Sequence, residues 1–279
     1  EPQQVRYFGS STAPYHVYLL FDGSGSTRHK WDFMRSAASA FVEFMKPQDR
    51  ISIGIFDARL KTIADWNDSR ENALDALNPI MSGLQSAGTT EFYRSLERAI
   101  ERSFDGIRER RAIIVLTDGR DTSLYREIIQ HNRVMNSEED KRFGGLYRTA
   151  ADKGIPIYFI AVNTDLNRDG STEGADEFRN LEIIYGESPV PTQYLEQVRI
   201  RMERIAQVSG GQVLFPETLD DIIPLFLRIG KTLGRSYSIG YVPQIEGPDP
   251  ALRRIVIKTK NDAHSVQQSR AGYYVTPPH

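Results

Sequence analysis

The chain has 279 residues, of which 39% are hydrophobic, and carries 35 basic and 37 acidic side chains. This composition is typical of a folded protein of one or two domains, and a formal net charge of −2 argues against a nucleic-acid-binding surface. The absence of cysteine excludes disulfides, thiolate metal sites and a cysteine nucleophile. No apolar run is long enough to predict a membrane span.

Four β-prone apolar runs are spaced along the first 162 residues, and each is typical of a strand buried on both faces of a parallel sheet. The runs are His16–Phe21, Ile51–Phe56, Arg111–Thr117 and Ile155–Val162. Segments with helical spacing of apolar residues separate them, which predicts right-handed crossovers and a mostly parallel sheet. Leu60–Trp66 follows the second run after only a few residues and predicts an antiparallel edge strand.

The later part of the body alternates again between helix and strand. Tyr194–Val208 is a charged amphipathic helix ended by a glycine pair, Gln212–Phe215 is a short strand, and Leu219–Leu233 is a final apolar helix.

After residue 235 the pattern changes to strands without helices. The candidates are Tyr237–Val242, Leu252–Lys260 and Ser265–Val275, and they are typical of a β-meander that extends the main sheet or forms an appended layer.

The predicted fold is therefore α/β, a doubly wound (Rossmann-like), mostly parallel central sheet with one antiparallel edge strand and a C-terminal β-meander. We expect a lead segment over 1–14, a domain over 15–235 with an insertion at 163–193, and a β-strand extension over 236–279.

Oxygen-bearing side chains follow the predicted strands. Asp22, Ser24 and Ser26 come directly after the first strand, Asp118 follows the third, and Thr89 precedes a helix between them. Ligands of parallel sheets bind at the carboxyl ends of the strands, so these side chains are expected to converge there. Hard oxygen ligands suit Mg²⁺ or Mn²⁺, and also Ca²⁺. The serines alone could instead cap a helix, but together with Thr89 and Asp118 they predict a metal site.

These residues carry a family resemblance. Asp22-Gly-Ser-Gly-Ser26, Thr89 in Ala-Gly-Thr-Thr and Asp118 in Leu-Thr-Asp-Gly resemble the metal-ion-dependent adhesion site of von Willebrand factor type A domains. All five ligand positions match in chain order, and Ala87 stands where the family often has glycine. The resemblance covers roughly 15–235. Two tail motifs, Tyr237–Pro243 and Ser269–Tyr274, are similar to a bacterial group, the VWFA-related acidobacterial domain.

The resemblance implies a non-enzymatic binding module. A partner protein or peptide would supply an Asp or Glu carboxylate that completes the shell of the ion. It also implies a secreted, periplasmic or cell-surface protein. The oligomeric state is left open.

A second cluster of oxygen ligands follows the fourth predicted strand. Its spacing matches positions 1, 3, 5, 7, 9 and 12 of an EF-hand calcium loop, with Gly170 at position 6. A solvated acidic loop is the alternative, because position 12 is an aspartate and a strand rather than a helix precedes the loop. The candidate Ca²⁺ ligands are Asp165, Asn167, Asp169, Ser171, Glu173 and Asp176.

Two other functions compete with metal-dependent binding. The ion could be purely structural, with the partner bound elsewhere. Alternatively, Asp22 could be the nucleophile of a Mg²⁺-dependent phosphotransferase, with Asp118 holding the ion. The phosphotransferase is disfavoured because Ser24 stands where a second acid is expected, and no lysine lies in a phosphate-binding motif.

Overall fold

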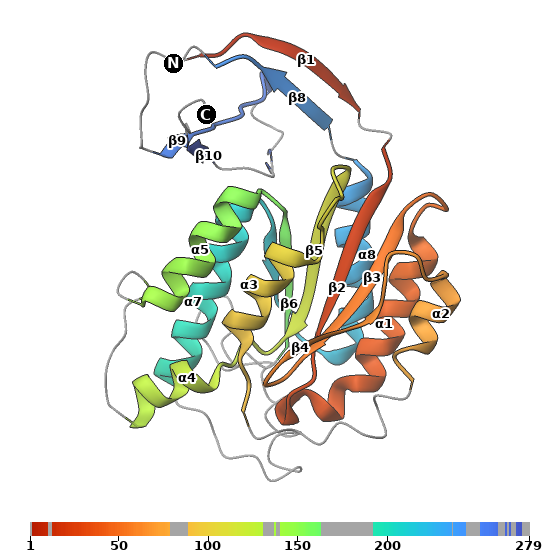
Figure 1. Cartoon of the computed structure of the whole chain (residues 1–279), viewed down its shortest axis with the longest axis vertical. Helices are drawn as coiled ribbons and strands as arrows, with labels where there is room; N and C mark the ends of the chain where they lie inside the picture. Colours follow the sequence, from red (N-terminus) through yellow and green to blue (C-terminus); the bar gives the residue numbers. More distant parts are fainter. Residues whose placement is uncertain are drawn as a thin grey trace.

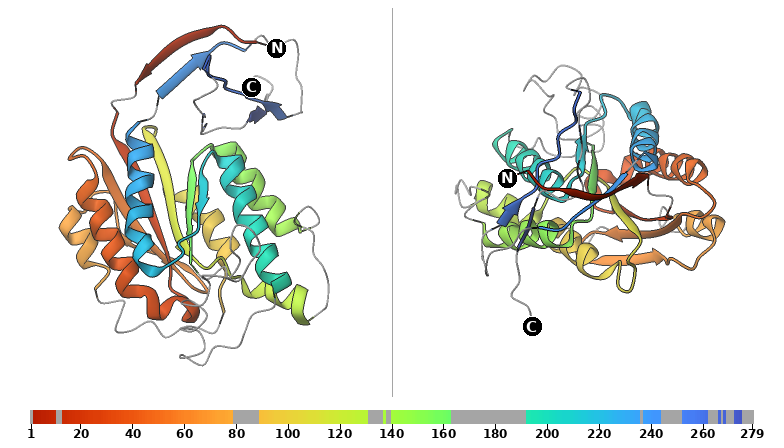
Figure 2. Two further views of the ribbon diagram at one scale, coloured as in Figure 1. Left: turned by 180° about the vertical axis from the view of Figure 1, so that it is seen from behind. Right: turned by 90° about the horizontal axis from the view of Figure 1, so that it is seen from above.

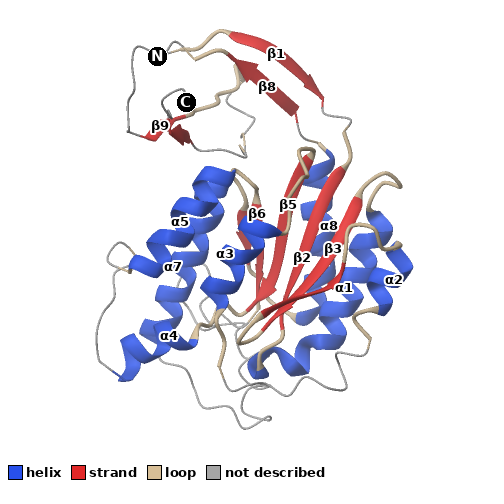
Figure 3. Ribbon diagram, viewed as in Figure 1, coloured by secondary structure: helices blue, strands red, loops and turns tan. Residues whose placement is uncertain are grey.

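The computed structural model describes residues 2–10, 13–78, 89–130, 137, 140–162, 192–235, 237–243, 252–261, 266, 268 and 272–274. Within them, a six-stranded sheet has the order β4-β3-β2-β5-β6-β7 (Figure 1, Figure 3). The strands are β2 (Tyr15–Asp22), β3 (Arg50–Phe56), β4 (Leu60–Ala64), β5 (Arg110–Thr117), β6 (Ile157–Ala161) and β7 (Gln212–Leu214). Strand β4 is antiparallel to β3 and the other neighbours are parallel, so the predicted α/β sheet with one antiparallel edge strand is confirmed.

Helices cover both faces of this sheet (Figure 1). One face carries α1 (Trp31–Phe44), α2 (Arg70–Asp75) and α8 (Ile222–Gly234), and the other carries α3 (Phe92–Arg102), α4 (Thr122–Tyr125), α5 (Lys141–Lys153) and α7 (Thr192–Ser209). Short helical turns are η1 (Gly25–Lys30), η3 (Arg126–Gln130) and η4 (Leu219–Asp221). None of the helices in the described part of the chain combines the length and apolar character that a membrane span requires.

The central strand shows why the apolar runs are continuous. In β2, Val17 and Leu19 pack into the core beneath α1 and α8, whereas Tyr18 and Leu20 pack into the core beneath α3, α5 and α7. Successive side chains of a strand point to opposite faces, so a strand with helices on both sides needs an apolar residue at every position.

The terminal strands form two small antiparallel sheets. Strand β1 (Val5–Ser10) pairs with β8 (Tyr237–Tyr241), and β9 (Leu252–Arg254) pairs with β10 (Gly272–Tyr274). Each of the three predicted tail segments contains a strand, but β9 covers only the first three residues of the predicted Leu252–Lys260, and the described residues 255–260 form no strand. In the described residues β8 pairs with the N-terminal strand instead of continuing into a meander with β9.

Topology explains this pairing. The guanidinium of Arg110, at the start of β5, donates to the carbonyl of Ala13 before β2 and to that of Leu233 at the end of α8. The chain therefore enters β2 and leaves α8 at the amino end of the sheet, and β1 and β8 meet there as a ribbon (Figure 2). The carboxyl ends of the strands lie at the other end of the body (Figure 1).

Candidate metal centre

Asp22 and Asp118 lie side by side at the carboxyl ends of two adjacent strands. Asp22 is the last residue of β2, Asp118 follows β5, and the two strands are in parallel register with Phe21 opposite Leu116. Both carboxylates are completely buried. The two acids that the sequence predicts for one site are thus brought together by the pairing of β2 with β5.

The loop after β2 is folded around the Asp22 carboxylate. The Ser24 amide donates to Asp22 Oδ1 at 2.9 Å, and the Thr117 hydroxyl donates to Asp22 Oδ2 at 2.5 Å. The Thr27 hydroxyl donates to the Asp22 carbonyl at 2.7 Å, which closes the turn. Ser24 is buried beside Asp22, whereas the side chain of Ser26 lies outside the described part of the structure, although its backbone belongs to η1.

Backbone hydrogen bonds hold the segment that carries Thr89 at the same edge. The Thr90 amide donates to the Thr122 hydroxyl at 2.8 Å, and the Thr122 amide donates to the Thr90 carbonyl at 2.9 Å. The Glu91 amide donates to the carbonyl of Asp57, directly after β3. Thr89 is half-buried and lies one residue before these contacts. The predicted ligand segments therefore converge between the ends of β3 and β5.

The negative charge of Asp22 and Asp118 at the carboxyl ends of β2 and β5 affects the pKa of Asp22. Burial and the neighbouring Asp118 raise the pKa of Asp22 to about 7, against the opposing effect of hydrogen bonds from Thr117 and Ser24. Arg120 Nε lies 3.5 Å from Asp118 Oδ2, and the Arg120 amide donates to Oδ1 at 2.9 Å.

The remaining ligands of an ion here would have to be uncharged oxygens. No group of three or more acidic or histidine side chains suited to a metal occurs among the described residues. Two carboxylates flanked by serine and threonine hydroxyls match the hard oxygen ligands that Mg²⁺ and Mn²⁺ prefer, so the residues present fit such an ion.

The raised pKa of Asp22 predicts how the stability of the metal-free protein changes with pH. The folded chain keeps a proton on Asp22 up to about pH 7, whereas the unfolded chain releases it near the ordinary value of 3.8. The folded state therefore binds more protons in that window, and the free energy of unfolding should fall as pH rises from about 4 to 7. Thermal unfolding in EDTA should show this decline, and Mg²⁺ should raise the melting temperature more at pH 8 than at pH 5.

The control for this pH dependence is Asp22→Asn, which keeps the shape of the side chain and removes its titration. Its melting temperature in EDTA should depend less steeply on pH between 4 and 7. Equal slopes in the two proteins would contradict the assignment.

The loop after Asp118 is held from behind by α7. Gly119 has a φ of +72°, and a Cβ atom there would lie 2.7 Å from Val198 Cγ1 and 2.8 Å from Met202 Sδ. The Tyr194 hydroxyl accepts from the Asp121 amide at 2.7 Å and donates to the Asp121 carbonyl at 3.1 Å. Glycine is therefore required at 119 for both its backbone conformation and the close approach of α7.

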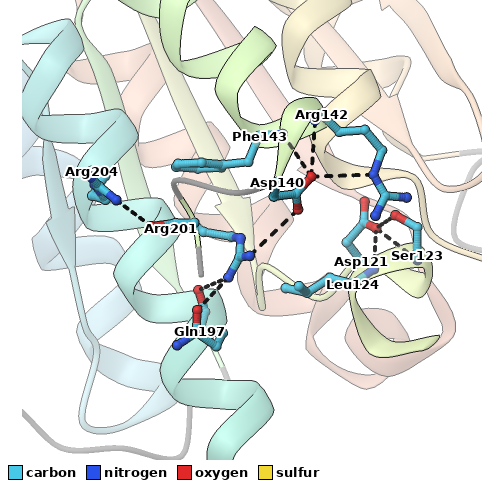
Figure 4. Close-up of polar contacts among 10 residues, drawn as sticks. Asp121, Ser123, Leu124, Asp140, Arg142, Phe143, Gln197, Arg201 and Arg204 are labelled. Atoms are coloured by element: carbon cyan, nitrogen blue, oxygen red, sulfur yellow. Dashed lines mark hydrogen bonds and ion pairs between the residues drawn. The ribbon is translucent and has the colours of Figure 1, made fainter. Parts of the chain in front are cut away.

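Asp121 organises the edge without being a predicted ligand. Its carboxylate accepts from the amides of Ser123 and Leu124, which caps α4 (Figure 4). It also accepts from the Tyr93 amide, which joins this segment to the start of α3. This role of Asp121 is not among the predictions from the sequence. An acidic residue directly before a helix is the usual position of an N-cap, and that pattern could have predicted it.

A buried ion pair joins α7 to α5 (Figure 4). Arg201 Nη2 lies 3.6 Å from Asp140 Oδ2, and both side chains are at most 1% exposed. Arg201 also donates to Gln197 Oε1 at 2.8 Å, while Asp140 Oδ1 accepts from the amides of Arg142 and Phe143 at the start of α5. Helix α7, which packs against Gly119 behind Asp118, is thereby fixed to its neighbour. No local pattern predicts this pair, because its two residues are far apart in the chain.

The predicted calcium loop lies outside the described residues. Its six candidate ligands are Asp165, Asn167, Asp169, Ser171, Glu173 and Asp176. Calcium binding there stays a prediction.

Comparison with known proteins gives the family. A family model described as the von Willebrand factor type A domain matches residues 16–198. Similar solved structures include a von Willebrand factor type A protein from Catenulispora acidiphila, with 14% identity, a TM-score of 0.51 and coverage of 80% of this chain and 43% of that one. The chain thus spans less than half the length of that relative.

Two further bacterial structures share the fold. An aerotolerance-related membrane protein from Bacteroides fragilis has 15% identity and a TM-score of 0.52, with coverage of 78% of this chain and 98% of that one. The pilus adhesin SpaC from Lactobacillus rhamnosus GG has 11% identity and a TM-score of 0.53, with coverage of 80% and 30%. These identities support the fold alone. Because the family model matches well over half of the chain, the protein belongs to the von Willebrand factor type A domain family.

Proposed function

We propose that the protein is a non-enzymatic, metal-dependent protein-binding module. A divalent ion, Mg²⁺ with Mn²⁺ or Ca²⁺ as alternatives, would be held directly or through water by Asp22, Ser24, Ser26, Thr89 and Asp118. The observation that supports this most strongly is the pair of fully buried carboxylates at adjacent strand ends, one of them with a pKa raised to about 7.

The carboxylates keep oxygen lone pairs for an ion. Asp22 Oδ1 accepts from the Ser24 amide, Oδ2 accepts from the Thr117 hydroxyl, and the Ser24 side chain adds a third hydrogen bond. An ionised carboxylate has about four acceptor positions, so these contacts orient Asp22 and leave an acceptor position for an ion.

The charge of the ligand set also suits binding of an acidic partner. Two carboxylates balance the charge of a divalent ion, and hydroxyl ligands add none. The ion would stay electrophilic, and an Asp or Glu carboxylate from a partner protein or peptide would complete its shell. Arg120, 15% exposed beside Asp118, offers a second positive group to such a carboxylate.

The calcium loop proposed at 165–176 would have a structural role. Ordering a long insertion costs conformational entropy, which a bound ion offsets. A secreted, periplasmic or cell-surface location is part of the same proposal, since extracellular calcium sites work at about 10⁻⁴ to 10⁻³ M.

The test uses Mn²⁺ as ion and glutarate as carboxylate probe. Electron paramagnetic resonance should show Mn²⁺ binding to the full chain, and glutarate should displace water from the bound ion, which lowers its enhancement of water proton relaxation. Ser24→Ala should weaken Mn²⁺ binding about tenfold, on the scale of one lost polar contact. Ser36→Ala is the control, because the exposed Ser36 hydroxyl donates to the Asp32 carbonyl of its own helix.

The outcomes separate the alternatives. Failure of Mn²⁺ to bind would contradict the metal site. Tight Mn²⁺ binding without any effect of glutarate would contradict ligand binding at the ion and leave the metal as a structural element.

A further inference from the structure

The guanidinium of Arg120 lies against Asp118, one of the two buried carboxylates of the candidate metal centre. Arg120 Nε is 3.5 Å from Asp118 Oδ2, and the Arg120 amide donates to Asp118 Oδ1 at 2.9 Å. The Asp118 side chain is 0% exposed and that of Arg120 is 15% exposed. Both oxygens of this proposed ligand are therefore contacted by one residue, whose side chain keeps a small exposed surface.

Arg120 offsets half of the negative charge that two ionised carboxylates bring to this place. Asp22 and Asp118 are both completely buried, and the Asp118 charge adds to the effect of burial in raising the pKa of Asp22. The Arg120 charge also acts within the body of the protein. Burial raises the pKa of Tyr194 on α7, the Asp118 charge adds to that rise, and the Arg120 charge opposes it. Arg120 thus serves as a counter-ion of Asp118 in this structure.

The contact between Arg120 and Asp118 Oδ2 is one that another charged group can replace. A charge-assisted hydrogen bond between nitrogen and oxygen has a length of about 2.7–2.9 Å. The 3.5 Å separation here is longer, so the pair is held mainly by charge and makes little demand on direction. The hydrogen bond from the Arg120 amide does not depend on where the guanidinium points. The side chain can therefore leave Asp118 Oδ2 without loss of the backbone contact that orients Asp118.

We infer that Arg120 is an exchangeable counter-ion: it balances Asp118 in the metal-free protein, and it binds the carboxylate of the partner once Asp118 holds a divalent ion. The inference rests on the proposed function, because it needs a metal ion and an acidic partner at this site. It goes further in giving one residue opposite effects on the binding of the two.

The opposite effects follow from the charges. A guanidinium beside Asp118 repels a divalent cation, so Arg120 weakens metal binding. An ion held by Asp118 takes up the charge of that carboxylate, and the attraction that keeps Arg120 beside it falls. The guanidinium then has capacity for another carboxylate, to which its planar set of N–H donors is well matched. Metal loading would therefore prepare the site for an acidic partner by releasing this side chain.

Arg120→Gln separates the two effects in the full chain. Its Mn²⁺ affinity, measured by electron paramagnetic resonance, should rise about tenfold, which lies within the usual range for coupling between two charged sites. The glutarate affinity of the Mn²⁺-loaded variant, measured by water proton relaxation, should fall about tenfold because a hydrogen bond to a charged group is lost. Arg120→Lys keeps the positive charge and should bind Mn²⁺ like the wild-type protein.

Arg142→Gln is the matched control. Arg142 Nε lies 3.6 Å from a carboxylate oxygen of Asp140, which is 1% exposed, so this variant removes the same type of ion pair. Asp140 is not among the proposed metal ligands, and neither affinity should change. Arg120→Met is a second variant without the charge, in case Arg120→Gln does not fold, and it retains an apolar stem to pack.

Thermal unfolding gives a readout that needs no carboxylate probe. In EDTA at pH 8, Arg120→Gln should melt at a lower temperature than the wild-type protein, because two buried carboxylates have lost a counter-ion. Saturating Mn²⁺ should raise the melting temperature of the variant by more than that of the wild-type protein.

The outcomes keep the inference distinct from the proposed function. A wild-type chain that fails to bind Mn²⁺, or whose bound Mn²⁺ is unaffected by glutarate, would overturn both. If the wild-type chain binds both, the inference alone is overturned when Arg120→Gln leaves the two affinities unchanged or shifts them in the same direction.

Discussion

Replacing Asp118 with asparagine is expected to abolish metal binding while leaving the chain folded. The side chain is completely buried next to Asp22, and its removal takes away half of the negative charge available to an ion. Even substitutions outside the ligand shell typically lower metal affinity 10- to 100-fold, so the loss should be about 100-fold or more. Isothermal titration with Mg²⁺ and Mn²⁺ measures it.

The stability of the Asp118→Asn variant distinguishes a ligand from a structural residue. In EDTA its melting temperature should stay close to that of the wild-type protein, because the substitution removes both the repulsion between two buried carboxylates and the attraction between Asp118 and Arg120. Asp57→Asn is the control, since Asp57 follows the neighbouring strand β3 and is not a predicted ligand. Metal affinity retained in Asp118→Asn would refute the site. If Asp118→Asn loses Mg²⁺ and Mn²⁺ binding but still binds Ca²⁺, the calcium ion would be assigned to the loop at 165–176.

Replacing Arg201 with methionine is expected to cost about 3–5 kcal/mol of unfolding free energy. Arg201 and Asp140 are 0% and 1% exposed, so the substitution removes the buried cation and leaves the carboxylate with only the half-exposed Arg142, whose Nε lies 3.6 Å from Asp140 Oδ1. Methionine fills most of the space of the arginine side chain, which limits the contribution of a cavity. Urea unfolding followed by the fluorescence of Trp31 and Trp66 measures the change.

The control for Arg201 lies on the same helix. Arg199 pairs with Glu203 at 3.0 Å, and the two side chains are 22% and 45% exposed. Surface pairs contribute about 0–1 kcal/mol, so Arg199→Met should change the free energy of unfolding by no more than that. Equal losses in the two variants would mean that burial of the ion pair has no special weight.

The sheet and the proximity of Asp22 to Asp118 could be predicted because both depend on local patterns. Continuous apolar runs such as His16–Phe21 occur where a strand has helices on both faces, and their lengths locate the strand ends. A parallel sheet brings those ends to one edge, so Asp22 and Asp118 are neighbours although 96 positions separate them in the sequence. The parallel topology of the sheet, and not the sequence between them, therefore predicts that these two residues are close in space.

The remaining contacts depend on pairings that no local pattern encodes. The pairing of β1 with β8 joins a segment near the start of the chain to one that follows α8, and either strand alone resembles many short β-prone segments. The contact of Tyr194 with Asp121 and the ion pair of Arg201 with Asp140 each require the docking of α7 to be known beforehand. Polar residues on an amphipathic helix are normally solvated, so the sequence of α7 favours exposure for Arg201.

The position of β2 has a mechanical consequence. This strand leads from the ribbon at one end of the body to Asp22 at the other, and it is paired along its length with β3 on one side and β5 on the other. Tension between a ligand held at the proposed metal site and the chain before β2 would run along β2. The hydrogen bonds of both ladders would then share the load in shear instead of breaking one after another, as they would in peeling. The strand that ends in Asp22, the first proposed metal ligand, is thus also well placed to resist a pull on a molecule bound there.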